Sequence, residues 1–130
     1  MALDFAFDRA LFSRYRFVNL YGRDLDLHNE RGTTVHEFKC DGHASVRRQP
    51  TKPSIFGVPV MTAPEVIGLP PPEPMVVVIV DSDVAQHLRM YPREYRGSVI
   101  TPCPRTHGPR DEKQPALVTR FVIVNIGIVD

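Results

Sequence analysis

The chain has 130 residues, of which 42% are hydrophobic and 24% charged, so it is long enough for one globular domain with a real core and too short for a second. Its formal net charge of +1 provides no global field of the kind that marks nucleic-acid or membrane-surface binders, so we expect no nucleic-acid partner. No apolar run approaches the roughly 20 residues that span a bilayer, so we expect no membrane partner either.

Residues 1–14 carry three phenylalanines among charged residues, which predicts an N-terminal arm and not a signal peptide. Leu3, Phe7 and Leu11 would share a helical face, but an extended arm fits equally well, and both possibilities stay open. The phenylalanines must be buried against their own domain or against a neighbouring subunit. We therefore expect a homo-oligomer that forms through the arm, with residues 15–130 as a single β-rich domain.

Alternating or β-branched runs between turn residues predict several short strands in the first half of the chain. These strands are expected at residues 15–20, 24–28, 33–40, 44–48 and 55–61. Residues 49–53 are expected to form a polar loop. Residues 62–74 contain five prolines and predict a stiff, extended connector, or alternatively a proline-motif ligand for a partner domain.

The best-defined stretch is MVVVIVDSDVAQHLRMY at residues 75–91. Its first six residues are all apolar, which predicts a central strand at 75–80 that is buried on both faces. Apolar residues then recur at helical spacing, so a short helix is expected over 83–91. Ser82 or Asp83 would supply the N-cap.

The last third of the chain predicts two more strands separated by a long loop. A short strand is expected at 98–101 and a strongly apolar one at 116–129, paired beside the central strand. The loop between them, PCPRTHGPRDEKQP at 102–115, has a length that is usually functional or disordered. The predicted fold class is therefore α+β and β-rich, with a mixed or antiparallel sheet around the central strand.

Seven short motifs are spread along the chain: Val18-Asn19-Leu20, Ala44-Ser45-Val46-Arg47, Gly57-Val58-Pro59-Val60, Gly68-Leu69-Pro70, Val78-Ile79-Val80, Val84-Ala85 and Arg110-Asp111. Their order is similar to that in a family of small uncharacterised phage and prophage proteins, whose first strand ends in Asn-Leu-Thr-Pro-His. The chain resembles this family over roughly residues 16–125. It departs from the pattern at Tyr21-Gly22-Arg23, which replaces Thr-Pro-His, and at Asp81, which replaces a serine. The resemblance implies a shared fold and a viral or phage-derived accessory protein, with no established activity.

Two cysteines are too few for a disulfide scaffold, but their neighbours suggest a possible metal site. Cys40 and His43 are spaced C-x2-H, and Cys103 and His107 are spaced C-x3-H. Thiolate and imidazole in two close pairs are ligands of structural zinc, and His36 is an equally good third ligand. We favour the simpler interpretation, two unrelated free cysteines with surface histidines, and so expect no cofactor.

Acidic and basic residues around the predicted helix suggest a ligand site. Asp81 and Asp83 follow the central strand, at the edge where open sheets bind ligands, although helix capping explains both carboxylates. Arginine side chains and loop N–H groups suit a phosphate or carboxylate, although acidic neighbours favour a solvated mixed-charge surface. The predicted ligand-binding set is Asp81, Asp83, Arg89, Arg93, Arg105, His107 and Arg110.

The sequence lacks a P-loop, a G-x-G-x-x-G motif, a nucleophile elbow and an H-E-x-x-H motif, so no catalytic residue is nominated. We expect a non-enzymatic viral accessory protein that binds a small anionic, nucleotide-like ligand or a protein surface, in the host cytoplasm or within a virion. One alternative is a virion structural protein, such as a minor capsid or cement protein. The other is a metal-dependent phosphoesterase that uses Asp81, Asp83 and His107.

Overall fold

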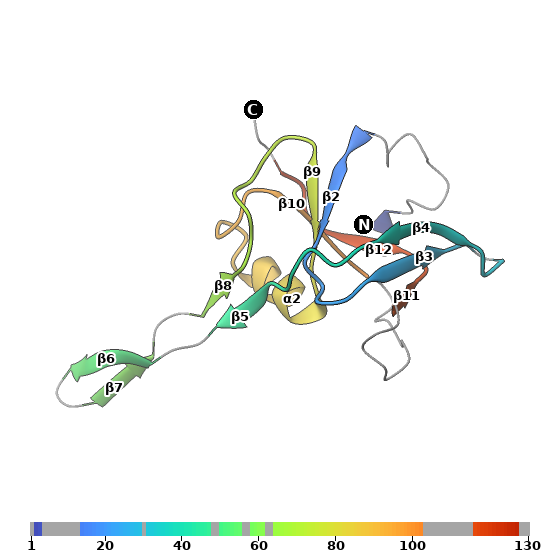
Figure 1. Ribbon diagram of the computed structural model, residues 1–130. Helices are drawn as coiled ribbons and strands as arrows, with labels where there is room; N and C mark the ends of the chain where they lie inside the picture. The colour runs from blue at the N-terminus through green and yellow to red at the C-terminus, as the bar shows by residue number, and fades with distance from the viewer. Residues whose placement is uncertain are drawn as a thin grey trace.

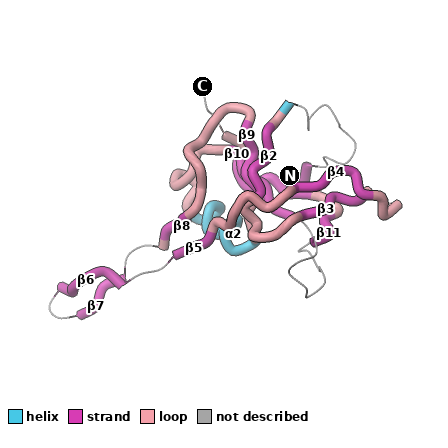
Figure 2. The backbone as a smooth tube through the Cα atoms, in the orientation of Figure 1, coloured by secondary structure: helices cyan, strands magenta, loops and turns pink. Residues whose placement is uncertain are grey.

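The computed structural model describes residues 2–3, 14–29, 31–47, 50–55, 58–61, 64–102 and 116–127. The short segments 2–3, 50–55 and 58–61 are described by their backbone alone. Within these ranges the protein is β-rich and has one helix, as the sequence predicts (Figures 1 and 2). No helix in the described ranges is long and apolar enough to cross a membrane.

A five-stranded mixed sheet with the strand order β1-β12-β10-β9-β2 forms the centre of the fold. β9 (Val76–Ile79) lies between β2 (Arg16–Asn19) and β10 (Ser98–Pro102), and is parallel to both. β12 (Phe121–Asn125) runs antiparallel to β10, and β1 (Ala2–Leu3) runs antiparallel to β12 at the edge. The start of the N-terminal arm is therefore extended and pairs within its own chain, while residues 4–13 lie outside the described residues.

The residues of β9 and the position after it point alternately to two separate cores, as the two-residue period of a strand requires. Val77 and Ile79 face one core, and Val78 and Val80 face the other. The first core also contains Leu25, Leu27, Phe38, Ile100, Ala116, Val118 and Phe121. The second also contains Leu20, Ala44, Val84, Ala85, Leu88, Tyr95 and Val99. The central strand is thus buried on both faces, as the continuous apolar run predicts.

A second sheet of three strands, in the order β11-β3-β4, covers the first core. β3 (Leu25–His28) is antiparallel to β4 (Thr34–Phe38) and parallel to β11 (Ala116–Val118). Alternate residues of β3 and β11 are buried, which matches one face on the core and one face toward solvent.

Helix α2 (Ser82–Met90) covers the second core and joins β9 to the parallel strand β10. Its N-cap is Asp81, whose backbone is extended and whose Oδ1 accepts the N–H of Val84 at 2.9 Å. The prediction of Ser82 or Asp83 as the N-cap is therefore wrong, because both residues already lie within the helix. The expected helix bounds are off by one residue at each end.

Two short antiparallel pairs lie between β4 and β9 in the chain. β5 (Ser45–Arg47) pairs with β8 (Glu65–Ile67), and β6 (Pro50–Ile55) pairs with β7 (Val58–Met61). Figure 1 shows β6 and β7 as a hairpin that extends away from the central sheet. The expected polar loop thus contributes to a strand, and the proline-rich connector contains β8.

The expected single strand at 116–129 is wrong, because Thr119 and Arg120 separate two strands that belong to different sheets. Its expected pairing beside β9 is also wrong, because β10 lies between β9 and β12. The helical crossover after β9 returns the chain to the neighbouring position of the same sheet, so β10 takes the place next to β9.

Candidate functional site

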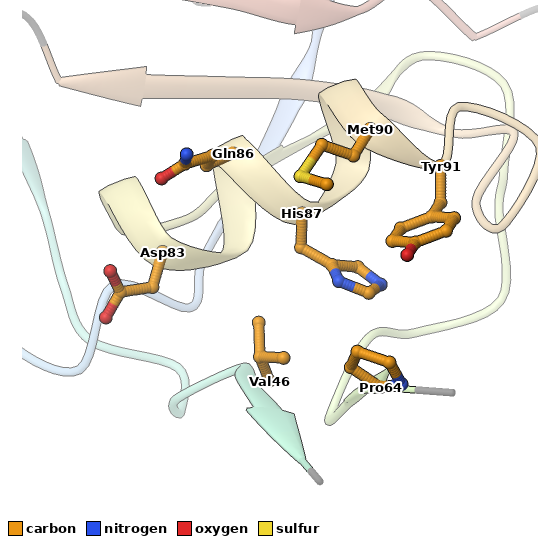
Figure 3. Close-up of a pocket in the computed structure, with 7 residues that line it drawn as sticks. All are labelled: Val46, Pro64, Asp83, Gln86, His87, Met90 and Tyr91. Atoms are coloured by element: carbon orange, nitrogen blue, oxygen red, sulfur yellow. The ribbon is translucent and has the colours of Figure 1, made fainter. Parts of the chain in front are cut away.

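A hollow of about 360 Å³ lies beside α2, between the helix and the β5–β8 pair (Figure 3). The described residues that line it are Val46, Pro64, Asp83, Gln86, His87, Met90 and Tyr91. Four of them come from α2 at spacings of three, one and three residues, so they share one face of the helix. Tyr91 is the C-cap residue, and Val46 and Pro64 complete the opposite wall.

The buried polar side chain of this hollow is His87, which is 6% exposed. Its Nε2 is hydrogen-bonded to Oε2 of Glu94, and Oε1 of Glu94 accepts the N–H of Val66 at 2.9 Å. Because a carboxylate can only accept, Nε2 carries a proton, and Nδ1 is an acceptor whenever the ring is neutral. Nδ1 has no hydrogen-bond partner among the described residues, and Figure 3 shows the ring pointing into the hollow.

A second hollow of about 580 Å³ adjoins the first. Its described lining residues are Pro64, Met90, Tyr91, Pro92, Arg93 and Glu94, and the first three also line the first hollow. We call the two together the α2 groove. Met90 and Tyr91 are 66% and 44% exposed, so the wall that the two hollows share is an exposed apolar surface. The Tyr91 ring lies 4.8 Å from the His87 ring, measured between centroids.

The charges of the α2 groove are divided between its two parts. Asp83 and Gln86 line the first hollow with a carboxylate and an amide, and Arg93 and Glu94 line the second with a guanidinium and a carboxylate. Arg93 follows the C-terminus of the helix, whereas Arg89 is exposed in the last turn and is not among the described lining residues. The described lining residues thus offer hydrogen-bond acceptors, an apolar wall and one guanidinium.

A separate polar cluster lies at the carboxyl edge of the parallel strands. Oδ2 of Asp81 lies 3.1 Å from Nε2 of His43, while its Oδ1 caps α2. The His43 ring lies over Gly22, where φ is +100° and an added Cβ would come within 3.2 Å of the ring. Asp81 is therefore engaged by the helix and by His43, whereas Asp83 lines the α2 groove. The two carboxylates do not form a joint site.

Asn19, the last residue of β2, is hydrogen-bonded to three other segments at this edge of the sheet. It is buried, with 1% of its surface exposed. Its Nδ2 donates to the carbonyls of Arg23 at 2.9 Å and Phe38 at 3.0 Å, and its Oδ1 accepts the N–H of Tyr21 at 3.0 Å. Asp41 accepts the Asn19 backbone N–H at 2.9 Å. Sequence reasoning did not assign this role to Asn19.

Of the four predicted zinc ligands, Cys40 and His43 lie in the described ranges, and Cys103 and His107 lie outside them. The Cys40 thiol is exposed and donates to the carbonyl of Gly42 at 3.4 Å. His36 packs edge-on against Phe38 at 4.6 Å between centroids, and burial lowers its pKa. No group of three or more His, Cys, Asp or Glu side chains in the described ranges could hold a metal ion. Four of the predicted site residues lie outside those ranges: Cys103, Arg105, His107 and Arg110.

Sequence reasoning did not single out His87, Glu94, Gln86, Met90 or Tyr91 as site residues. One signal was available, because His87 lies within one turn of the apolar Val84 and Leu88, and a histidine on a buried face needs a polar partner.

Comparison of the chain with family models, with curated proteins and with solved structures gives no match.

Proposed function

We propose that this protein is a non-enzymatic binding protein that holds a small anionic, nucleotide-like ligand in the α2 groove. The observation that carries the proposal is the continuity of the two hollows, which share Pro64, Met90 and Tyr91. Their volumes, about 360 and about 580 Å³, lie in the range of small-molecule sites.

Each part of such a ligand has a matching surface. A flat heterocycle suits the exposed ring of Tyr91 and the polarizable side chain of Met90, because stacking and sulfur contacts favour planar π systems. A phosphate on the same ligand would reach Arg93 in the second hollow, where a guanidinium can pair with two oxygens.

The composition of the groove favours binding over catalysis. Its described lining residues include no serine, threonine or cysteine that His87 could activate as a nucleophile. The described lining residues supply hydrogen bonds, a stacking surface and the guanidinium of Arg93, which are sufficient for recognition.

Isothermal titration calorimetry with nucleoside monophosphates and the corresponding nucleosides tests the proposal. Arg93→Gln is expected to weaken binding of a nucleotide about tenfold, since loss of a charge-assisted hydrogen bond of about 1.5 kcal/mol corresponds to that factor. It should leave nucleoside binding unchanged. The matched control is Arg89→Gln, which removes the same charge outside the groove lining. Equal effects of the two substitutions, or no binding of any nucleotide, would contradict the proposal.

The second candidate function is that of a virion structural protein, which the β6–β7 hairpin favours. The hairpin extends away from the central sheet (Figure 1), where it could pair with a neighbouring copy in a lattice. Three further proposals come from the sequence and hold under either function. They are a viral origin, a location in the host cytoplasm or the virion, and a homo-oligomer formed through the N-terminal arm. Quantitative detection of the protein in purified particles at a fixed ratio to the capsid protein would favour the structural role.

A further inference from the structure

We propose that residues 70–74, which read PPPEP, form a docking motif for a protein domain whose groove is lined by aromatic side chains and binds polyproline II helices. We call these residues the proline segment. None of them is among the described lining residues of the α2 groove, so this inference goes beyond the proposed function and does not depend on it.

Proline chemistry sets the backbone conformation at the start of the proline segment. A proline ring holds its own φ at about −65°, and it restricts the preceding residue to extended values of ψ. Pro70 and Pro71 meet both conditions, because each is itself a proline and precedes another one. These two conditions define polyproline II, and residues 69–73 belong to no helix or strand. The segment therefore begins as a polyproline II helix before any partner binds.

A hydrogen bond from the core anchors the start of the proline segment. The Tyr95 hydroxyl donates to the carbonyl of Pro70 at 2.9 Å, and Tyr95 is a buried residue of the second core. Leu69, which precedes the segment, packs against the same core. The first proline is thus held on the surface of the domain at a defined position.

A turn anchors the other end of the proline segment. The carbonyl of Glu73 accepts the N–H of Val76 at 3.4 Å, with Pro74 and Met75 between them. Met75 has a φ of +63°, the sign that a type II turn requires at its third position, and proline is common at the second. The carbonyl of Met75 accepts the N–H of Arg16, the first residue of β2, at 2.8 Å. Both ends of the segment are therefore held by the folded domain.

The anchored segment is exposed and mostly apolar. Pro71, Pro72 and Pro74 are exposed, as is Met75 after them. Polyproline II has three residues per turn, so the P-x-x-P spacing of Pro71 and Pro74 suits recognition from one side. A rigid surface of this kind loses little conformational entropy when a partner binds.

The chemistry of the proline segment favours this partner over others. Four of its five residues lack a backbone N–H, so the segment cannot pair as an added strand with the edge of a sheet. Its one charged residue is Glu73, whose carboxylate lies 3.6 Å from the Arg16 guanidinium, and an acidic segment does not suit a nucleic acid or an anionic membrane. An aromatic-lined groove uses the groups that remain, which are the pyrrolidine rings and the backbone carbonyls.

Titration of the intact protein into a panel of purified SH3, WW and EVH1 domains tests the proposal. The chain has no tryptophan, so tryptophan fluorescence reports on the added domain alone. At least one domain is expected to bind, and a proline-rich peptide that occupies the groove of that domain should compete with the protein.

Substitution of single prolines locates the contact. Pro71→Ala is expected to weaken the binding about tenfold, because it removes one ring of the P-x-x-P pair and loosens the backbone. The matched control is Pro53→Ala, which makes the same change in β6, outside the segment, and should leave the binding unchanged. Circular dichroism confirms that each variant is folded, and Pro72→Ala tests the same surface if Pro71→Ala does not fold.

Three results would overturn the proposal. The first is no binding by any domain of the panel at concentrations up to about 1 mM. The second is binding that the proline-rich peptide does not reduce, because the contact would then lie outside the polyproline groove. The third is an equal loss of affinity in Pro71→Ala and Pro53→Ala.

Discussion

Glu94 connects α2 to β8 through its two carboxylate oxygens, of which Oε2 pairs with Nε2 of His87 and Oε1 accepts the N–H of Val66 at 2.9 Å. The helix face and the strand on the far side of the α2 groove are thereby held by one side chain. Pre-organised walls lower the entropic cost of ligand binding, which explains why a rigid pairing lies beside an otherwise open groove.

Glu94→Ala should destabilise the fold by about 2 kcal/mol, because it leaves the His87 ring proton and the Val66 N–H without their acceptor. Glu94→Gln keeps the size of the side chain and one acceptor, so it should cost less. Urea denaturation followed by circular dichroism measures both values. An alanine variant as stable as the wild type would show that this pairing does not hold the groove walls.

Asp81→Ala should cost about 1 kcal/mol of stability, the typical value for loss of an N-cap side chain. Asp81→Asn should retain most of that stability, because asparagine caps helices nearly as well. Denaturation midpoints of the two variants measure the difference. If asparagine lowers stability as much as alanine does, the charge of Asp81 beside His43 contributes more to stability than the helix cap.

Asn19→Ala should destabilise the protein by about 3 kcal/mol, since one buried amide satisfies two carbonyls and one N–H. The matched control is Asn29→Ala. Oδ1 of Asn29 accepts the N–H groups of Arg31 and Thr33 in an exposed turn, where water can replace it, so the cost should stay below about 1 kcal/mol. Similar losses for the two variants would contradict the role given to Asn19.

Tyr95 should make stability depend on alkaline pH. Its hydroxyl donates to the carbonyl of Pro70 at 2.9 Å, and burial, with a smaller contribution from Glu73, raises its pKa. A raised pKa in the folded state means that the stabilisation is fully present below the unfolded pKa of about 10 and is lost as the pH rises through the folded pKa.

The free energy of unfolding measured between about pH 8 and pH 11 checks the Tyr95 prediction. Tyr95→Phe cannot ionise, so the wild type should lose more stability than this variant above about pH 10. Parallel curves for the two proteins would exclude Tyr95 as the titrating group.

The central strand and the helix after it could be predicted because their signals are local. The continuous apolar run requires burial on both faces, and the spacing of Val84 and Leu88 requires a helix. The order of the strands could not be predicted, because the position of β10 between β9 and β12 depends on a pairing between distant segments.

The candidate site was only partly predictable for the same reason. Asp83 and Arg93 both belong to the predicted ligand-binding set and line the groove. The sequence could not separate Arg89 from Arg93, because that distinction depends on the helix ending at Met90. Nor could the sequence pair His87 with Glu94. Glu94 lies beyond the end of α2, so the helical spacing of apolar residues does not predict this hydrogen bond.

The position of the ligand is the central claim, and an NMR titration tests it most directly. Amide shifts of ¹⁵N-labelled protein would be followed as the concentration of a nucleoside monophosphate rises. We predict that the largest shifts fall on residues 83–94, in α2 and the turn after it. Shifts concentrated at residues 40–43 and Asp81 would place the ligand at the carboxyl edge of the sheet and contradict the account.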